Sequence, residues 1–367
     1  MFTVDDATLQ AVGETVIEAL GATPDIARDV ADHLVDADRR GHGSHGVRMI
    51  PIYASLIEEG ELVPDATPTT NALVDGCVSV DGRRSFGQVA GRVAVDRAIE
   101  EAAGGLSLVG VGNTTHLGRI GRYGERAAEA GMLFVALVNV PETGGEGPVA
   151  PLGSTAGGLG TNPLCFAVPP FDALPHPVVV DVASSQVAIG KVRRAAASGT
   201  ELEPEWTTDP NGEPVTDPEA YFEGDGVLLP LGGRTTGHKG FGLAVAAELF
   251  GSLVGDGFIS GQSDIDWGNH AAFFVADPTV FSDRNAIEDR LDAFAAHLQE
   301  FEYDEAIGTG KSSRSDRGAL PGWPEYRSDE KRRREGVPMP DDDLTELARL
   351  AREHGVGDVI PSAWPEQ

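Results

Sequence analysis

The run from Arg39 to Arg48 holds the densest group of chemically active side chains in this chain. It reads Arg-Arg-Gly-His-Gly-Ser-His-Gly-Val-Arg, and its glycines allow the backbone to approach a ligand closely. Ser44 can donate or accept a hydrogen bond, His45 can transfer a proton near neutral pH, and Arg48 can bind a carboxylate through two parallel hydrogen bonds. These residue types predict a site for a small anionic molecule.

A second histidine stands in a glycine-rich turn after a predicted strand, Leu106–Val111. The turn has some glycines of the Rossmann dinucleotide fingerprint, but Thr115 stands at the third glycine position. No acidic residue ends a second strand about 20 residues later, as that fold requires. The spacing therefore argues against a Rossmann fold. It leaves His116 at a strand-to-helix turn, where functional side chains often face a cleft.

Three further segments have residue types that suit a nucleotide cofactor. Gly157–Pro163 is rich in glycine, and Asp181–Gln186 follows a predicted strand. The hydroxyls and amides of the latter could hold phosphate oxygens, while Asp181 could orient a histidine. Gly237–Gly242 opens a predicted apolar helix, whose free amides suit an anion together with Lys239, one of four lysines in the chain.

The hydrophobic pattern predicts a chain of mixed α/β or α+β class with an N-terminal helical cap over residues 3–60. Residues 195–235 and 304–340 are polar and rich in turn signals. The remaining predicted strands are 70–82, 106–111, 133–138, 178–182 and 273–276, and the remaining predicted helices are 88–103, 120–130, 241–254, 284–301 and 341–354.

The composition excludes several partners. Asp and Glu total 58 against 28 Lys and Arg, which gives a net charge of -30. Nucleic acid and anionic membranes would be repelled, and no run approaches the roughly 20 apolar residues of a membrane span. The first residues lack a signal-peptide pattern, so we expect a cytoplasmic protein. Cys77 and Cys165 have no zinc or disulfide spacing. The acidity and the scarcity of lysine favour a halophilic origin.

Six segments resemble, in the same order, the malate/L-lactate dehydrogenase family. This family includes L-sulfolactate and ureidoglycolate dehydrogenases and piperideine-2-carboxylate reductase, and it is unrelated to the Rossmann-type enzymes. The resemblance covers nearly the whole chain. The segments are Ser44–Arg48 with Tyr53, Asn113–His116, Gly160–Pro163, Asp181–Ser184, His238–Gly242 and Leu320–Gly322.

The resemblance implies an NAD(P)-dependent oxidoreductase that acts on a small 2-hydroxy or 2-oxo acid of the malate, lactate or sulfolactate type. It implies a mixed α/β, non-Rossmann NAD(P)-binding fold like that of L-sulfolactate dehydrogenase, with a mostly antiparallel central sheet. Residues 1–75 with 304–367 would form a helical domain from both chain ends, and 76–303 the catalytic region, with a break near 120–140. A homodimer with active sites near the subunit interface is also implied.

The resemblance also assigns roles to individual residues. His116 or His45 would transfer the proton, with Ser44 and Asp181 beside them, and we favour His116. Arg48 and Tyr53 would contact the substrate, with Arg48 on its carboxylate. No metal ion is expected. The expected cofactor residues are Gly160, Thr161, Asn162, Asp181, Val182, Ala183, Ser184, Ser185, His238, Lys239, Gly240, Pro321 and Gly322.

Three alternatives remain open at this point. An NADPH-dependent reductase of a cyclic imino acid would present the same carboxylate to Arg48. A zinc hydrolase could use His42, His45 and His116 as ligands. A binding module could keep the fold without catalysis. The choice between NAD and NADP is also open, although Arg193 or Arg194 could meet a 2'-phosphate.

Overall fold

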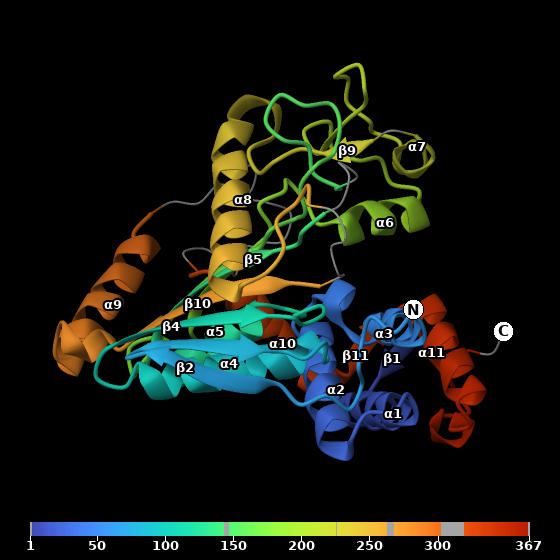
Figure 1. Ribbon diagram of the computed structural model, residues 1–367. Helices are drawn as coiled ribbons and strands as arrows, with labels where there is room; N and C mark the ends of the chain where they lie inside the picture. Colours follow the sequence, from blue (N-terminus) through green and yellow to red (C-terminus); the bar gives the residue numbers. More distant parts are fainter. Residues whose placement is uncertain (1, 143–146, 225, 263–267, 302–318, 366–367) are drawn as a thin grey trace.

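A mixed sheet forms the centre of the molecule, and helices cover both of its faces (Figure 1). The computed structural model describes residues 2–142, 147–224, 226–262, 268–301 and 319–365. Among these residues the sheet has seven strands in the order β2-β3-β4-β10-β5-β6-β7. The strands are β2 (Thr69–Val74), β3 (Cys77–Asp81), β4 (Leu106–Gly112), β5 (Leu133–Asn139), β6 (Leu164–Val168), β7 (Val178–Val182) and β10 (His270–Ala276).

The pairing of these strands is mostly antiparallel. Only β3 and β4 run parallel among the described neighbours. Strand β10 enters late in the sequence and lies between β4 and β5, so it joins the two segments that flank the histidine turn. The predicted mixed α/β class and mostly antiparallel sheet are confirmed.

The helices α4 (Gly87–Glu101) and α5 (Gly121–Glu129) cover one face of the sheet. Small side chains such as Ala90, Ala94 and Ala98 are fully buried, which lets α4 approach the strands closely. The long helix α8 (Gly233–Gly255) contacts β4, β5 and β10 from the opposite face. Helix α9 (Arg284–Gln299) has no buried residue.

A second core joins the two ends of the chain. Strand β1 (Phe2–Val4) pairs antiparallel with β11 (Val337–Met339). The apolar faces of the neighbouring helices share one buried cluster with this pair. Two of these helices have an N-cap residue. The side chains of Asp5 and Thr23 accept hydrogen bonds from the backbone N–H groups three residues later. The helices are α1 (Asp6–Ala19), α2 (Pro24–Arg39), α3 (Ile50–Glu58) and α11 (Asp341–Glu353).

A third, smaller core lies between residues 149 and 228. It is formed around α6 (Ile189–Ser198), α7 (Pro218–Glu223) and the short pair β8 (Thr207–Thr208) and β9 (Val227–Leu228). Figure 1 shows this region on the same side of the sheet as α8. None of the described helices is both long enough and apolar enough to cross a membrane.

The structure corrects several predicted elements. The predicted strand 70–82 is a hairpin of β2 and β3. Strand β6 and helices α6 and α10 (Trp323–Glu335) were not predicted. Helix α10 buries only Asp329, so it shows no apolar periodicity. The predicted polar segment at 304–318 lies outside the described residues.

Candidate active site

The loop between α2 and α3 carries the first group of predicted site residues. Ser44 and His45 lie in one 3-10 turn, and Arg48 lies in the next. Ser44 Oγ is 2.9 Å from His45 Nδ1, so the hydroxyl and the ring are hydrogen-bonded. At the start of α6, a Cβ on Gly190 would lie 3.0 Å from Ser44 Cβ. The third core region therefore contacts the loop directly.

The buried carboxylate of Asp38, near the end of α2, holds this loop. Asp38 Oδ2 accepts a hydrogen bond from the Val47 amide at 2.9 Å. A Cβ on Gly46 would lie 2.0 Å from Asp38 Oδ1, so only glycine lets the loop pass the carboxylate. Burial raises the pKa of Asp38 to about 7, against the opposing effects of its hydrogen bond and of nearby Arg332 and Arg48.

The second predicted histidine meets the first. The rings of His45 and His116 are stacked, with centroids 5.3 Å apart and planes inclined by 26°. The turn after β4 that carries His116 is held by the residue before β10, because Asn269 Oδ1 accepts a hydrogen bond from the Leu117 amide at 3.0 Å. Two segments far apart in the sequence thus bring two imidazole rings into contact.

Tyr53, expected at the substrate, is fully buried and contacts the histidine instead. Its hydroxyl lies 2.9 Å from His116 Nδ1. Gln88, at the start of α4, donates from Nε2 to the same hydroxyl at 2.5 Å. Helix α3 is apolar and packs into the chain-end core, which draws the Tyr53 ring inward and leaves its hydroxyl at the histidine.

Both histidines are held in their neutral form. Burial lowers the pKa of His116 to about 3, and the neighbouring His45 adds to the effect. Burial lowers the pKa of His45 to about 4, with further contributions from His42 and Arg119. At neutral pH each ring therefore has one unprotonated nitrogen that can accept a proton.

Arg48 is the cation of the loop. Its Nε lies 3.8 Å from Asp343 Oδ1 on α11, and about a third of its side chain, 37%, is exposed. A contact of this length is a loose ion pair without a short hydrogen bond. The guanidinium can therefore turn to an incoming carboxylate at small cost.

The expected cofactor segments come together at the edge of the third core. The amide of Ser184 donates to Thr161 O at 2.9 Å, and the amide of Leu231 donates to Ser184 O at 2.8 Å. The Gly240 amide in turn donates to Leu231 O at 3.1 Å. Backbone hydrogen bonds thus join the segments 160–162, 181–186 and 238–240.

Several side chains in these segments, which the sequence predicts to lie at the cofactor, make hydrogen bonds within the protein. The Ser184 hydroxyl donates to Thr161 O and the Ser185 hydroxyl to Val187 O. Asn162 is fully buried and donates from Nδ2 to Glu248 Oε2 at 2.8 Å. Buried backbone oxygens and carboxylates need such donors, so these groups are already used.

Asp181, expected to orient a histidine, instead holds the start of α5. Its Oδ2 accepts the Gly121 amide at 2.7 Å, a favourable position at a helix N-terminus. Pro321 O accepts the Val179 amide at 3.0 Å, which brings the 320–322 segment to β7. The two segments line one cavity of about 190 Å³, whose walls are His42, Arg119, Glu125, Val179, Val180, Asp181, Val182, Pro321, Gly322 and Glu325.

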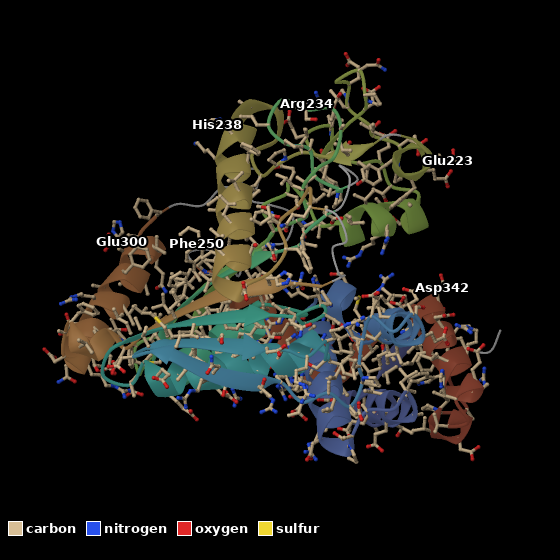
Figure 2. All side chains as sticks on the ribbon, viewed as in Figure 1. Glu223, Arg234, His238, Phe250, Glu300 and Asp342 are labelled. Carbon is tan, nitrogen blue, oxygen red and sulfur yellow. The ribbon has the colours of Figure 1, made fainter. Side chains whose placement is uncertain are left out.

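His238 and Lys239 are exposed on the first turns of α8. The helical span begins at Gly233, but Thr236 has a non-helical backbone, so a second helical segment starts at Gly237 as expected. Of the amides at this start, the Gly240 amide donates to Leu231 O. Figure 2 shows His238 near the end of α8 that lies away from the sheet.

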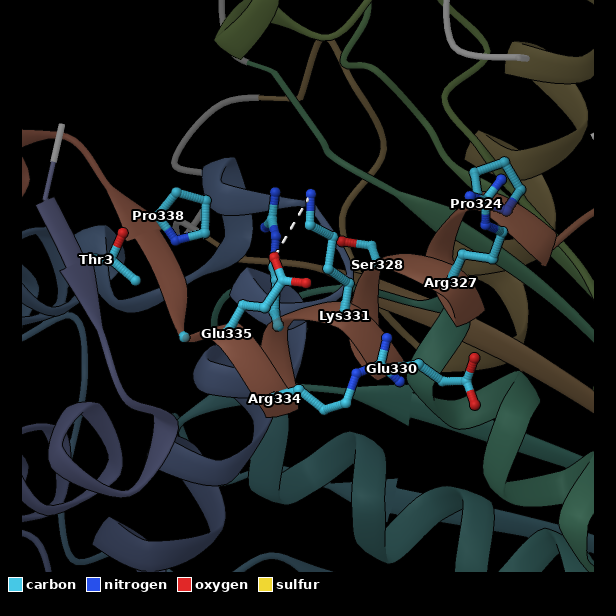
Figure 3. A pocket seen from close by; sticks show the side chains of 11 residues that line it. Thr3, Pro324, Arg327, Ser328, Glu330, Lys331, Arg334, Glu335 and Pro338 are labelled. Carbon is cyan, nitrogen blue, oxygen red and sulfur yellow. Dashed lines mark ion pairs between the residues drawn. The ribbon is translucent and has the colours of Figure 1, made fainter. Parts of the chain in front are cut away.

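Another cavity lies elsewhere and has no predicted site residue in its wall. Its volume is about 630 Å³, and it lies along α10 beside β1 and β11 (Figure 3). Arg327, Lys331 and Arg334 contribute positive charge, and Lys331 Nζ pairs with Glu335 Oε2 at 3.7 Å. Within the described ranges, no three His, Cys, Asp or Glu side chains are grouped as metal ligands.

The residues that sequence reasoning missed are buried polar groups: Gln88, Asp38 and Arg119. Gln88 stands among apolar residues at the start of α4, and this isolated amide was the one available signal. Arg119 is 3% exposed and binds Asp36 Oδ2 at 2.9 Å and Glu125. Its importance depends on contacts that no local pattern predicts.

Such a chain, with a mixed sheet and a histidine pair outside a Rossmann turn, has known relatives. Residues 4–348 match the Malate/L-lactate dehydrogenase family, and the protein belongs to it. The chain is 31% identical to Hydroxycarboxylate dehydrogenase B of Escherichia coli (strain K12), over 99% of this chain and 97% of that protein. An oxidoreductase is therefore supported.

Two further comparisons extend this result. A Delta(1)-pyrroline-2-carboxylate/Delta(1)-piperideine-2-carboxylate reductase of Pseudomonas putida is 30% identical, over 93% of this chain and 95% of that protein. The solved sulfolactate dehydrogenase from Methanocaldococcus jannaschii has a TM-score of 0.80 at 24% identity, over 97% of this chain and 98% of that one. This structural likeness confirms the expected sulfolactate dehydrogenase-like fold.

Proposed function

We propose that the protein transfers a hydride between NAD or NADP and a small 2-hydroxy or 2-oxo acid of the malate, lactate or sulfolactate type. The observation that carries the proposal is the stacked pair His45 and His116, each bound at Nδ1 by a hydroxyl group. Such a pair can move one proton without a metal ion. Family membership and the adjoining Arg48 support the same reaction.

His116 is the proposed proton-transfer residue. In the oxidation of a hydroxy acid, its neutral ring takes the hydroxyl proton as the carbon loses hydride, and in reduction it returns that proton. His45 and Ser44 position the reacting oxygen. Arg48 binds the carboxylate, and its charge stabilises negative charge that develops on the oxygen. The negative charge of the substrate carboxylate also favours the protonated form of His116. Substrate binding therefore raises the pKa of His116, which burial lowers in the free protein.

The cofactor residues fit a dinucleotide in part. When bound, the nicotinamide supplies the carbon that accepts or gives the hydride. Val182, Pro321 and Gly322 line the cavity of about 190 Å³ and would contact the bound cofactor. Lys239 is exposed near the joined segments and would contact a phosphate. Ala183 and Gly160 would supply backbone contacts, whereas Ser184, Ser185 and Asn162 keep their internal hydrogen bonds.

An absorbance assay at 340 nm tests the proposal. NADH and NADPH are each mixed with oxaloacetate, pyruvate or sulfopyruvate, with the His116→Ala variant as a control. We expect cofactor oxidation with one oxo acid and a strong loss in the variant. A folded protein that binds the cofactor and turns over none of these acids would contradict it.

Reduction of a cyclic imino acid is the second candidate. The relative from Pseudomonas putida, whose name states such a reductase, favours it. The imine presents the same carboxylate to Arg48, and His116 would protonate nitrogen instead of oxygen. Piperideine-2-carboxylate in the same assay separates the two candidates, because turnover of the imine alone would exclude the dehydrogenase.

We further propose a homodimer, supported by an exposed apolar face. Large side chains on the α8 side of the sheet lie open, with Leu253 at 73% and Phe250 at 48% exposure. Figure 2 places Phe250 on this face, and a hollow of about 490 Å³ lies over the strands. Patches of this kind mark protein interfaces. Sedimentation at two protein concentrations, with Leu253→Glu for comparison, tests the dimer.

Two broader proposals follow from the sequence. The pairing of β1 with β11 supports a helical domain of 1–75 with 304–367 beside a catalytic region of 76–303. The net charge of -30 supports a halophilic protein, since strong salt screens acidic self-repulsion. Unchanged folding and activity after removal of salt would contradict the second proposal.

A further inference from the structure

A buried line of uncharged polar groups leads from helix α4 to the proposed catalytic ring. Gln88 Nε2 donates to the Tyr53 hydroxyl at 2.5 Å, and that hydroxyl lies 2.9 Å from His116 Nδ1. Gln88 is 2% exposed and Tyr53 is fully buried. Phe86 meets the Tyr53 ring edge-on and closes this side of the line. Bulk water is therefore excluded, and each group depends on its protein neighbour.

The protons in this line can be counted. Burial raises the pKa of the Tyr53 hydroxyl, so it keeps its single proton at neutral pH. When Gln88 donates to the tyrosine oxygen, the tyrosine proton points to His116 Nδ1. Nδ1 is then the acceptor, and the proton of the neutral ring lies on Nε2. The other face of the amide, Gln88 Oε1, is buried and has no hydrogen-bond partner among the described residues.

We propose that Gln88, acting through Tyr53, is a positioning residue that decides which ring nitrogen of His116 carries the proton. The inference rests on the proposed role of His116 in proton transfer. Gln88 touches neither the substrate nor the cofactor in this account. It acts by offering either an amide N–H or an amide oxygen to the tyrosine.

The two amide orientations suit the two halves of the reaction. With the N–H toward Tyr53, His116 carries its proton on Nε2 and can donate a hydrogen bond to a carbonyl oxygen. With the amide oxygen toward Tyr53, the tyrosine hydroxyl donates its proton to Gln88. The tyrosine oxygen then accepts a hydrogen bond from a proton on His116 Nδ1. Nε2 is then able to take the proton of a hydroxy acid, whose O–H bond breaks as a new N–H bond forms. The resulting charged ring keeps the same bond to Tyr53.

The test combines a double-mutant cycle with nitrogen NMR on the full-length protein. Histidine labelled with 15N reports which ring nitrogen is protonated, and the His116 signals are identified by their loss in His116→Gln. The variants are Gln88→Leu, Tyr53→Phe and the double variant, with Gln88→Met as a second removal of the amide. Gln10→Leu is the matched control, because its amide bonds Glu14 and lies in α1.

We expect the wild-type protein and Gln10→Leu to show His116 with its proton on Nε2. Gln88→Leu and Gln88→Met give a mixture of both tautomers and lower kcat about tenfold, with KM within about twofold, a small part of the usual acid–base contribution. The double variant matches Tyr53→Phe, because the effect of Gln88 passes through the tyrosine.

An unchanged tautomer in Gln88→Leu and Gln88→Met would overturn the inference. So would additive losses of kcat in the double variant, because a packing defect acts independently of the tyrosine. The NMR signature needs no turnover. If the tautomer responds to Gln88 while none of the oxo acids is reduced, the proposed function fails and the assignment of Gln88 stands.

Discussion

Two polar regions lie side by side in this protein, a buried ion-paired cluster and a half-buried histidine pair that is neutral. In the ion-paired cluster, Arg119 binds Asp36 and Glu125, with Arg40 and Arg122 close by. Burial alone would raise the pKa of Asp36, but the three guanidinium groups outweigh it and lower that pKa. In the histidine pair, His45 and His116 have hydroxyl partners at Nδ1, and burial keeps them neutral.

The difference teaches what burial does in the presence and absence of a counter-charge. In a buried ion pair, each charge favours the ionised form of the other, so the protonation states do not change easily. Removing either partner is costly, because it leaves an unpaired charge in the interior. A half-buried neutral ring can change its protonation state when a nearby charge changes. Arg119 follows His116 closely in the sequence, so the rigid region supports the reactive one.

The largest expected effect is the loss of Arg119. Arg119→Met leaves Asp36 and Glu125 buried without their main cation, and we expect a loss of about 3–5 kcal/mol in the free energy of unfolding. Arg126→Met is the control, because its ion pair with Asp96 is half exposed and contributes at most about 1 kcal/mol. Denaturant titration measures both. Equal losses would show that the cluster is no more important than a surface pair.

The histidine pair makes the next largest prediction. His116→Ala should lower kcat about 10²-fold or more, the usual range for a general acid or base. The melting temperature should also fall, because the variant removes a packed ring and the hydrogen-bond partner of the buried Tyr53 hydroxyl, so kcat is measured below the unfolding transition. His45→Ala should give the smaller loss of kcat under the same assay. The reverse order would exchange the roles of the two rings.

Arg48 extends the comparison to an exposed cation. Arg48→Ala should raise KM about tenfold or more, because the guanidinium binds the carboxylate, and should also lower kcat by a smaller factor, because its charge stabilises the developing oxyanion. Arg349→Ala, which removes another arginine from the surface of α11, is the control. Steady-state kinetics decide the point, and an unchanged KM in Arg48→Ala would remove its role as the carboxylate ligand.

The smallest expected effect is the pH dependence of stability that Asp38 causes. It adds a third case to the comparison, a buried carboxylate. It is a buried carboxylate whose closest partner is a backbone amide, and its pKa is raised to about 7. The folded state thus holds a proton that the unfolded state loses near pH 4, so stability falls as pH rises through 7. Between pH 6 and 7 the loss is about 1 kcal/mol. Asp38→Asn should lack this slope, and an equal slope in both proteins would contradict the assignment.

The main strands of the sheet could be predicted from the sequence because their apolar runs are continuous. β4, β5, β7 and β10 all carry such runs. β6 could not, since its five residues lie beside a segment dominated by glycine and proline. α10 could not either, because it is held by polar contacts such as Arg39 with Asp329 at 2.8 Å.

The candidate site shows the same division. His45, His116 and Arg48 could be selected because few structural roles need those residue types in a glycine-rich turn. The sequence could not show that the two rings stack, nor that Tyr53 lies behind one of them. Asp181 had a plausible partner in a histidine, yet its carboxylate binds the Gly121 amide, a contact set by the packing of α5 against β7.

The central claim is that burial keeps the histidine pair neutral, while the neighbouring arginines keep Asp36 ionised. An NMR titration of the labelled histidine rings in the free protein tests it most directly, with His45→Gln and His116→Gln to identify the signals. We expect His45 to titrate at about pH 4 and His116 at about pH 3. Titration of both rings near pH 6.5, the ordinary value for histidine, would contradict the account.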